Sequence, residues 1–193
     1  MSRKPPLRQE LLAARRLLTA EDVGNAASVL ASTAAALPEL ADARTVAAYV
    51  SVGREPGTHV LLDVLRARGV RVLLPVLMAD NDLDWGLFEG ADHLVPSGRG
   101  LLEPDGPRLG PRAVLEADAV LLPGLAVDGR GMRLGRGGGS YDRVLARLSA
   151  AGAHPALVVL LYDDEVVTRV PEEPHDHPVD AVVTPAGARR FVR

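Results

Sequence analysis

The stretch that decides the fold is residues 45–75, TVAAYVSVGREPGTHVLLDVLRARGVRVLLP. The apolar run over residues 45–50 is typical of a buried strand, and Thr58 follows a glycine- and proline-containing turn as the expected cap of a helix over residues 59–68. A second apolar run, residues 70–75, comes directly after the glycine that ends the helix. Strand, helix and strand in this order predict a βαβ unit with parallel strands.

The same alternation continues outward from this unit. An N-terminal helix is expected to begin near Pro5 and to run through Leu18, and Thr19 with Asp22 forms a capping box for a second helix. Further strands are predicted at residues 84–89, 119–122, 156–162 and 179–184, a helix at 141–150, and an extended loop at 96–111. The chain is therefore expected to be α/β, a single three-layer α/β/α domain over residues 1–193 with a mainly parallel sheet.

Composition limits the functions that the chain can have. The 193 residues carry a net charge of −3, with 47% hydrophobic residues and no cysteine, so thiolate chemistry is excluded and no general basic field attracts nucleic acid or anionic membranes. The apolar runs are too short to span a bilayer and no signal peptide is visible, which favours a cytoplasmic protein without an obligate protein partner. The single lysine, Lys4, is notable in a chain that otherwise uses arginine.

A loop rich in glycine and arginine follows the strand at 119–122. Residues 129–139 contain six glycines and three arginines, Arg130, Arg133 and Arg136. Glycine lets consecutive backbone N–H groups turn toward an anion without interference from a Cβ, and guanidinium groups add donors, so the loop suits a phosphate. Asp142 in the following helix could reach a metal ion carried by that phosphate. The alternative is a solvated turn, and the loop matches neither a Walker A nor a G-x-G-x-x-G pattern.

Three other segments could share a crevice with this loop: the basic N-terminus, the turn at residues 51–57, and residues 174–178, PHDHP. Turns that follow parallel strands meet at one edge of a sheet, where ligands bind in such folds. His175 and His177 flank Asp176, but a surface turn is favoured there over a transition-metal site.

Taken together, these segments resemble the 5-formyltetrahydrofolate cyclo-ligases, also called 5,10-methenyltetrahydrofolate synthetases. Residues 129–143, GRGMRLGRGGGSYDR, are similar to the GxRLGxGGGYYDR signature of that family, and residues 123–128, PGLAVD, are similar to its P-G-x-A-F-D. The N-terminal segment, residues 49–56 and residues 175–184 support the resemblance, which covers nearly the whole chain in order.

The resemblance implies a reaction and a set of ligands. Members of the family convert 5-formyltetrahydrofolate to 5,10-methenyltetrahydrofolate through a phosphorylated formyl group, while ATP and magnesium are used and ADP and phosphate are released. The implied ATP-binding residues are Lys4, Arg8, Arg133, Leu134, Gly135, Arg136, Gly137, Gly138, Gly139, Ser140 and Tyr141, of which Lys4, Arg8 and Arg136 are implied to be catalytic. The implied folate-binding residues are Val50, Glu55, Arg136, Gly137, Gly138, Gly139 and Ser140, and the implied magnesium ligands are Asp142 and Asp176.

Three positions depart from the family pattern. Ser140 stands where the family has the first of two tyrosines, Val127 replaces a phenylalanine as a packing change, and Glu165 replaces a glutamine that could touch substrate. These departures leave open a non-catalytic or regulatory paralogue that binds folate or nucleotide. An RNA-binding module is disfavoured, because aromatic residues make up only 3% of a chain with negative net charge.

Overall fold

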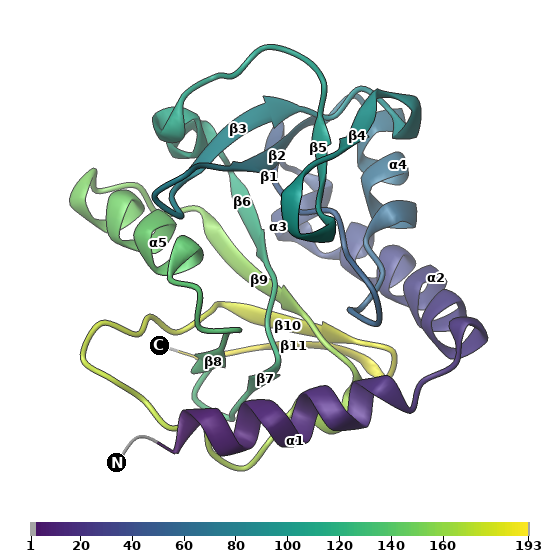
Figure 1. Ribbon diagram of the computed structural model, residues 1–193, viewed down its shortest axis with the longest axis vertical. Coiled ribbons are helices and arrows are strands. Elements are labelled where there is room, and N and C mark those ends of the chain that lie inside the picture. The colour runs from purple at the N-terminus through teal and green to yellow at the C-terminus, as the bar shows by residue number, and fades with distance from the viewer. Residues whose placement is uncertain (1–2, 193) are drawn as a thin grey trace.

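A seven-stranded sheet organises the computed structural model, which describes residues 3–192 (Figure 1). Its strands lie in the order β11-β10-β9-β6-β1-β2-β3, with bounds Gly187–Arg190, Ala181–Thr184, Ala156–Leu160, Ala119–Leu122, Thr45–Ala47, Arg71–Leu77 and Leu83–Leu87 respectively. The five inner strands pair in parallel, and only the edge strands β3 and β11 run antiparallel to their neighbours. The predicted α/β fold with a mainly parallel sheet is confirmed.

Helices connect and cover these strands. They are α1 (Lys4–Arg16), α2 (Ala20–Ala36), α3 (Pro38–Ala41), α4 (His59–Ala67) and α5 (Ser140–Ala150), with short 3₁₀ turns η1 (Ala91–His93), η2 (Gly98–Gly100), η3 (Pro111–Glu116) and η4 (Asp163–Glu165). The capping box predicted for α2 is confirmed, because the Asp22 N–H donates to Thr19 Oγ1 at 3.1 Å and the Thr19 N–H donates to Asp22 Oδ2 at 2.8 Å. None of the helices within residues 3–192 combines the length and the apolar character that crossing a bilayer requires.

Apolar side chains on both faces of the sheet are buried. In β6, Ala119 and Leu121 pack in a core cluster with residues of α2 and α4, whereas Val120 and Leu122 pack in a second cluster with residues of α5 and η3. Successive side chains of a strand point to opposite faces, so a strand covered on both faces is apolar throughout. Helices therefore form a layer on each side of the sheet, as the sequence predicts.

Thr58 does not cap α4 as predicted. No side chain caps the N-terminus of that helix; instead the Thr58 hydroxyl donates to the Tyr49 carbonyl oxygen at 2.7 Å and accepts from the Ser51 N–H at 2.9 Å. The Thr58 N–H donates to Ser51 Oγ at 3.0 Å. The threonine thus closes the turn after β1 rather than the helix end, and it fixes a loop that carries Glu55.

Three strand pairings were not predicted, because the sequences of the strands involved lack alternation of apolar and polar residues. The segment expected to be a loop at 96–111 contains β5 (Leu102–Pro104), which pairs with β4 (Leu94–Pro96). A small hairpin of β7 (Ala126–Val127) and β8 (Arg133–Leu134) encloses Gly129 and Gly131 and ends just before Gly135, and the edge strand β11 returns beside β10.

The first helix lies across the β7–β8 hairpin (Figure 1). Leu11 of α1 is buried against Leu125, Met132 and Leu134 of that region. This packing brings the N-terminal turn of α1 to the loop that precedes β10, although the two segments lie at opposite ends of the chain.

Candidate active site

A cavity of about 510 Å³ opens where the turns after β1 and β6 meet the start of α1 and the glycine- and arginine-rich loop of residues 129–139, here called the Gly-Arg loop. Every site residue implied by the resemblance lines it: Lys4, Arg8, Val50, Glu55, Arg133, Leu134, Gly135, Arg136, Gly137, Gly138, Gly139, Ser140, Tyr141, Asp142 and Asp176. The cavity has the size of a small-molecule site. The fold thus brings together segments that are up to 172 residues apart in the chain.

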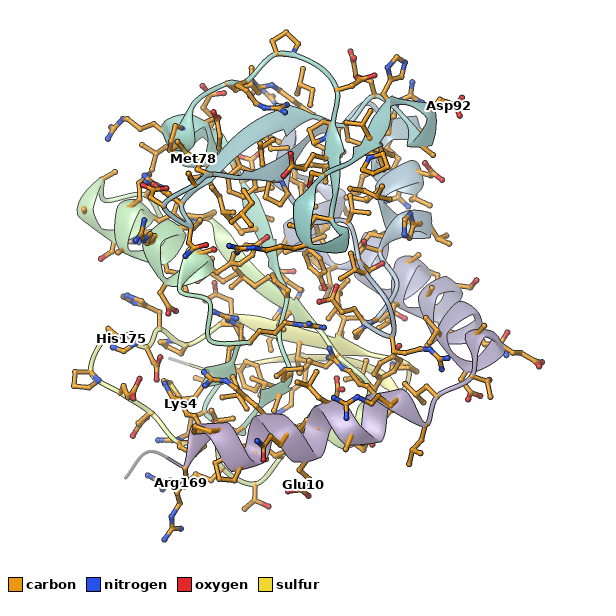
Figure 2. All side chains as sticks on the ribbon, in the orientation of Figure 1. Lys4, Glu10, Met78, Asp92, Arg169 and His175 are labelled. Carbon is orange, nitrogen blue, oxygen red and sulfur yellow. The ribbon has the colours of Figure 1, made fainter. Side chains whose placement is uncertain are left out.

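Lys4 is buried in the wall of this cavity, in contact with two carboxylates. Its Nζ lies 3.0 Å from Glu173 Oε2 and 2.6 Å from Asp176 Oδ2. Desolvation opposes the charged ammonium, but the hydrogen bonds and charges of Asp176 and Glu173 outweigh it and raise the pKa of Lys4. Figure 2 shows Lys4, at the start of α1, and His175, on the loop before β10, at the same end of the molecule.

The cluster around Lys4 could hold a cation. One ligand atom from each of Glu173, His175 and Asp176 lies within 4.8 Å of the others. The pKa of Asp176 is lowered, because bonds from Lys4 and from the Glu173 N–H outweigh the desolvation that would raise it. Asp142 lines the same cavity but is not part of this grouping. The sequence interpretation missed Glu173, although it lies three residues before Asp176 in an acidic turn, and it favoured a surface turn over a metal site for His175.

Arg8 reaches over the Gly-Arg loop. Its Nε donates to the Gly135 carbonyl oxygen at 2.8 Å. Gly137 has a φ of +94°, and a Cβ there would lie 3.0 Å from the guanidinium carbon of Arg8. Glycine at this position therefore allows both a left-handed backbone and the close approach of the arginine.

The loop offers a row of unused backbone donors. Within residues 3–192, the N–H groups of residues 135–139 donate to no other group of the chain. Gly139, with a φ of +80°, starts α5, and no side chain caps that helix end. Free N–H groups at a helix N-terminus form a site for anions, so the predicted phosphate-binding character of the loop has a structural basis.

Arg133 and Tyr141 form the inner wall beside the loop. Arg133 Nη1 donates to the Pro123 carbonyl oxygen at 2.8 Å. Desolvation lowers the pKa of Arg133, while the charges of Asp142 and Asp176 oppose this effect. The Tyr141 hydroxyl is buried without a partner among the described residues, and burial raises its pKa. A buried donor without a partner is suited to a polar atom of a ligand.

Glu55, on the turn after β1, also lines the cavity and contacts the Gly-Arg loop. Its Oε2 accepts the Val52 N–H at 2.8 Å, and its Oε1 lies 3.4 Å from Arg136 Nε. Apolar side chains of the cavity come from β2, β3 and the segment of residues 94–104 that contains β4 and β5, here called the β4–β5 arm: Leu77, Leu83, Leu101 and Leu102. The cavity therefore combines cationic groups and N–H donors with a carboxylate and apolar surface, and the Glu55–Arg136 contact joins the two sets of residues.

The three departures from the family pattern lie in different environments. Ser140 lines the cavity, so the missing aromatic ring concerns the site itself. Val127 is fully buried in the core, as expected of a packing change. The sequence left open whether Glu165 touches substrate; Glu165 does not line the cavity, and its carboxylate is buried against Arg15 of α1, with Arg15 Nε and Glu165 Oε1 2.6 Å apart.

Comparisons with known proteins agree with this geometry. The model of the 5-formyltetrahydrofolate cyclo-ligase family matches residues 1–185. The 5-formyltetrahydrofolate cyclo-ligase of Mycolicibacterium smegmatis is 46% identical over 149 residues, which cover 74% of each chain. That of Escherichia coli K12 is 34% identical over 177 residues, or 89% of this chain and 94% of the relative.

The fold is also that of a solved relative. The NMR structure of Aquifex aeolicus 5,10-methenyltetrahydrofolate synthetase superposes with a TM-score of 0.82 at 28% identity, covering 98% of this chain and 93% of that one. Sequence and structure lead to the same assignment: the chain belongs to the 5-formyltetrahydrofolate cyclo-ligase family.

Proposed function

We propose that this chain converts 5-formyltetrahydrofolate to 5,10-methenyltetrahydrofolate, with ATP and magnesium, through a phosphorylated formyl intermediate. The observation that carries the proposal is the convergence of Lys4, Arg8, the free N–H groups of the loop and Glu55 on one cavity. Membership in the family and the names of the relatives support the overall conversion. We further propose that residues 1–193 act as one domain on small molecules alone.

The reaction needs the formyl oxygen to become a leaving group. An N-formyl group is an amide, so N10 cannot displace its oxygen directly. The formyl oxygen attacks the γ-phosphorus of ATP, an O–P bond forms, and the bond to the β-phosphate oxygen breaks to release ADP. N10 then attacks the activated carbon and loses its proton, and phosphate leaves with the formyl oxygen to give the methenyl bridge.

Lys4 and Arg8 are proposed to hold the phosphates of ATP. Phosphoryl transfer depends on alignment and on neutralisation of charge rather than on a nucleophilic side chain. The two cations lie four residues apart on α1, one helical turn, and both side chains reach the cavity. Arg136 and the N–H groups of residues 135–139 supply further donors toward charge that develops during the transfer.

The carboxylates at the Lys4 end are proposed to hold magnesium. Asp176 and Glu173 offer hard oxygen ligands, which magnesium prefers, and Asp142 is the further carboxylate of the cavity wall. A bound magnesium ion supplies positive charge that neutralises the polyphosphate. Lys4 already contacts two of these carboxylates. The same group of residues would therefore keep the magnesium ion next to the phosphates of the nucleotide.

Glu55 and Val50 are proposed to bind the pterin. A carboxylate accepts hydrogen bonds from an amino-pyrimidine edge, and one oxygen of Glu55 is held in place by the Val52 N–H. The apolar side chains of the β4–β5 arm provide surface for the rings of the folate. Ser140, at the start of α5, leaves one wall of this region without an aromatic side chain.

The test is the absorbance of methenyl-folate formed from 5-formyltetrahydrofolate by the purified protein, with ATP and magnesium each omitted in turn. We expect turnover only when both are present, with one ADP formed for each methenyl product. Binding of both ligands without turnover would identify the non-catalytic paralogue instead. ADP release without methenyl product would refute the phosphorylated intermediate as the route to ring closure.

A further inference from the structure

A buried ion pair fixes the far end of α1, outside the cavity. Arg15 and Glu165 are exposed by only 4% and 3%, and neither lines the cavity. Arg15 Nε lies 2.6 Å from Glu165 Oε1, and Arg15 Nη2 lies 3.0 Å from Glu165 Oε2. Arg15 Nη2 also donates to the Gly124 carbonyl oxygen at 2.7 Å. The guanidinium is thus held by three directional bonds to two different loops.

Arg15 shares a helix face with the cations of the cavity. Lys4, Arg8, Leu11 and Arg15 follow one another at spacings of four, three and four residues, which place side chains along one stripe of a helix. Leu11 is buried against the β7–β8 hairpin between the two polar ends of this stripe. Apolar packing is not directional, so the rotation and the axial position of α1 depend on its directional bonds, which are those of Lys4 and Arg8 at one end and those of Arg15 at the other.

The same pair reaches the walls of the cavity by two routes. Gly124, whose carbonyl accepts from Arg15, is itself a lining residue. The second route runs through Tyr162: its N–H donates to Glu165 Oε2 at 3.0 Å, and the guanidinium carbon of Arg15 lies 5.8 Å from the centre of its ring. The Tyr162 hydroxyl donates to the Arg54 carbonyl oxygen at 2.9 Å, next to Glu55.

We infer that Arg15 and Glu165 are a positioning pair that sets α1, and with it Lys4 and Arg8, at the nucleotide end of the cavity. This inference rests on the proposed function. Stability alone does not account for the pair, since buried ion pairs replaced by apolar side chains of similar volume are often as stable or more so. What the ion pair adds is direction: the guanidinium donates to both oxygens of the Glu165 carboxylate and to the Gly124 carbonyl oxygen.

The experiment measures binding rather than turnover. Affinities for a non-hydrolysable ATP analogue with magnesium, and for 5-formyltetrahydrofolate, are measured by calorimetry at a temperature where circular dichroism shows each variant to be folded. The variants are Arg15→Gln, Glu165→Gln and the apolar pair Arg15→Met with Glu165→Leu. Arg190→Gln is the matched control, because the Arg190–Glu39 pair has nearly the same bond lengths, 2.6 and 2.9 Å, and does not line this cavity.

We expect each single variant to raise the Kd for the nucleotide analogue about tenfold, which corresponds to a coupling of about 1.4 kcal/mol between the ion pair and nucleotide binding. The control should change this Kd less than about twofold. The Kd for the folate should rise less than that for the nucleotide, since the route through Tyr162 ends at a backbone carbonyl beside Glu55. The apolar pair should recover thermal stability without recovering nucleotide affinity.

Two results would overturn the inference in distinguishable ways. If the unchanged protein binds the nucleotide and the apolar pair binds it equally well, Arg15 and Glu165 are only a packing element and the inference alone fails. If the unchanged protein binds no nucleotide at all, the proposed function fails and the inference fails with it.

Discussion

Replacement of Gly137 by alanine tests whether Arg8 and the Gly-Arg loop work as one unit. A Cβ at this position would lie 3.0, 3.1 and 3.2 Å from Cζ, Nη1 and Nη2 of Arg8. These distances are shorter than ordinary contacts, so the guanidinium must shift by a few tenths of an ångström, and we expect this shift to weaken its bond from Nε to the Gly135 carbonyl oxygen. The φ of +94° adds backbone strain that any residue with a Cβ would feel.

Two separate effects follow, each with its own magnitude. The backbone strain should lower the free energy of unfolding by about 1–3 kcal/mol, as for other non-glycine residues held in a sparsely populated region. Loss of one charged hydrogen bond between Arg8 and phosphate costs about 1.5–3 kcal/mol, which raises the KM for ATP by about 10- to 150-fold. The KM for the folate should change less, because Arg8 is assigned to the phosphates of ATP alone, whereas the folate is assigned to Val50 and Glu55 as well as to the loop.

Gly152→Ala is the matched control for strain. Gly152 also has a positive φ, +65°, but a Cβ there would meet no atom within 4 Å, and the residue does not line the cavity. Urea unfolding and initial rates of methenyl formation are measured for both variants. Gly152→Ala should lose stability and keep its KM for ATP. If Gly137→Ala also kept the normal KM for ATP, the proposed role of Arg8 would be refuted.

Three further predictions concern single charged groups. Lys4→Ala should raise the KM for ATP by about tenfold or more, as expected for loss of a charged contact, while the folate Kd measured by fluorescence stays within about twofold; unchanged ATP kinetics would contradict the assignment of the ammonium to phosphate. Glu55→Gln should weaken folate binding by about tenfold and leave the affinity for the ATP analogue unchanged; the reverse pattern in calorimetry would show that the two ligands are placed the wrong way round. Asp82 has a pKa lowered from 3.8, first by its hydrogen bond from Arg147, so its stabilising contribution is fully present above pH 3.8 and is lost as the pH falls through the lowered folded value. The difference in urea midpoint between the unchanged protein and Asp82→Asn should therefore shrink below pH 3.8, and a difference that stayed constant there would contradict this linkage.

The parts of the fold that the sequence predicted are those set by local pattern. The capping box of α2, the apolar strand β6 and the helix α5 follow from residues within a few positions of one another. Strand β11, by contrast, reads GARR and has no apolar alternation, so its place in the sheet depends on the turn that follows β10 and on antiparallel pairing with it. Pro75 likewise lies inside β2, although proline has no N–H to donate within a sheet. It is accommodated there because the pairing of β1 with β2 ends at Leu73.

The candidate site also combines features that a local pattern predicts with features that depend on contacts between distant residues. The Gly-Arg loop was visible because its residues are contiguous, and resemblance supplied the partners of that loop. Lys4 and Glu173 are 169 positions apart in the chain, and Arg15 and Glu165 are 150 positions apart. No local pattern in the sequence predicts contacts over such separations. Glu165 is an example: the sequence marked it as a departure from the family pattern and left its contact with substrate open, whereas in the structure a buried arginine neutralises its charge.

The two edges of the sheet have a consequence for solubility at high concentration. An exposed strand edge can recruit another chain by pairing with it, which is a route to aggregation. On the β3 side, the chain itself occupies that edge, where the Leu109 N–H donates to the Trp85 carbonyl oxygen at 2.8 Å. On the other side, β11 is only four residues long and carries Arg189 and Arg190 in succession. One edge is thus partly covered and the other is short and doubly charged, so we expect neither edge strand to pair readily with a second copy of the chain.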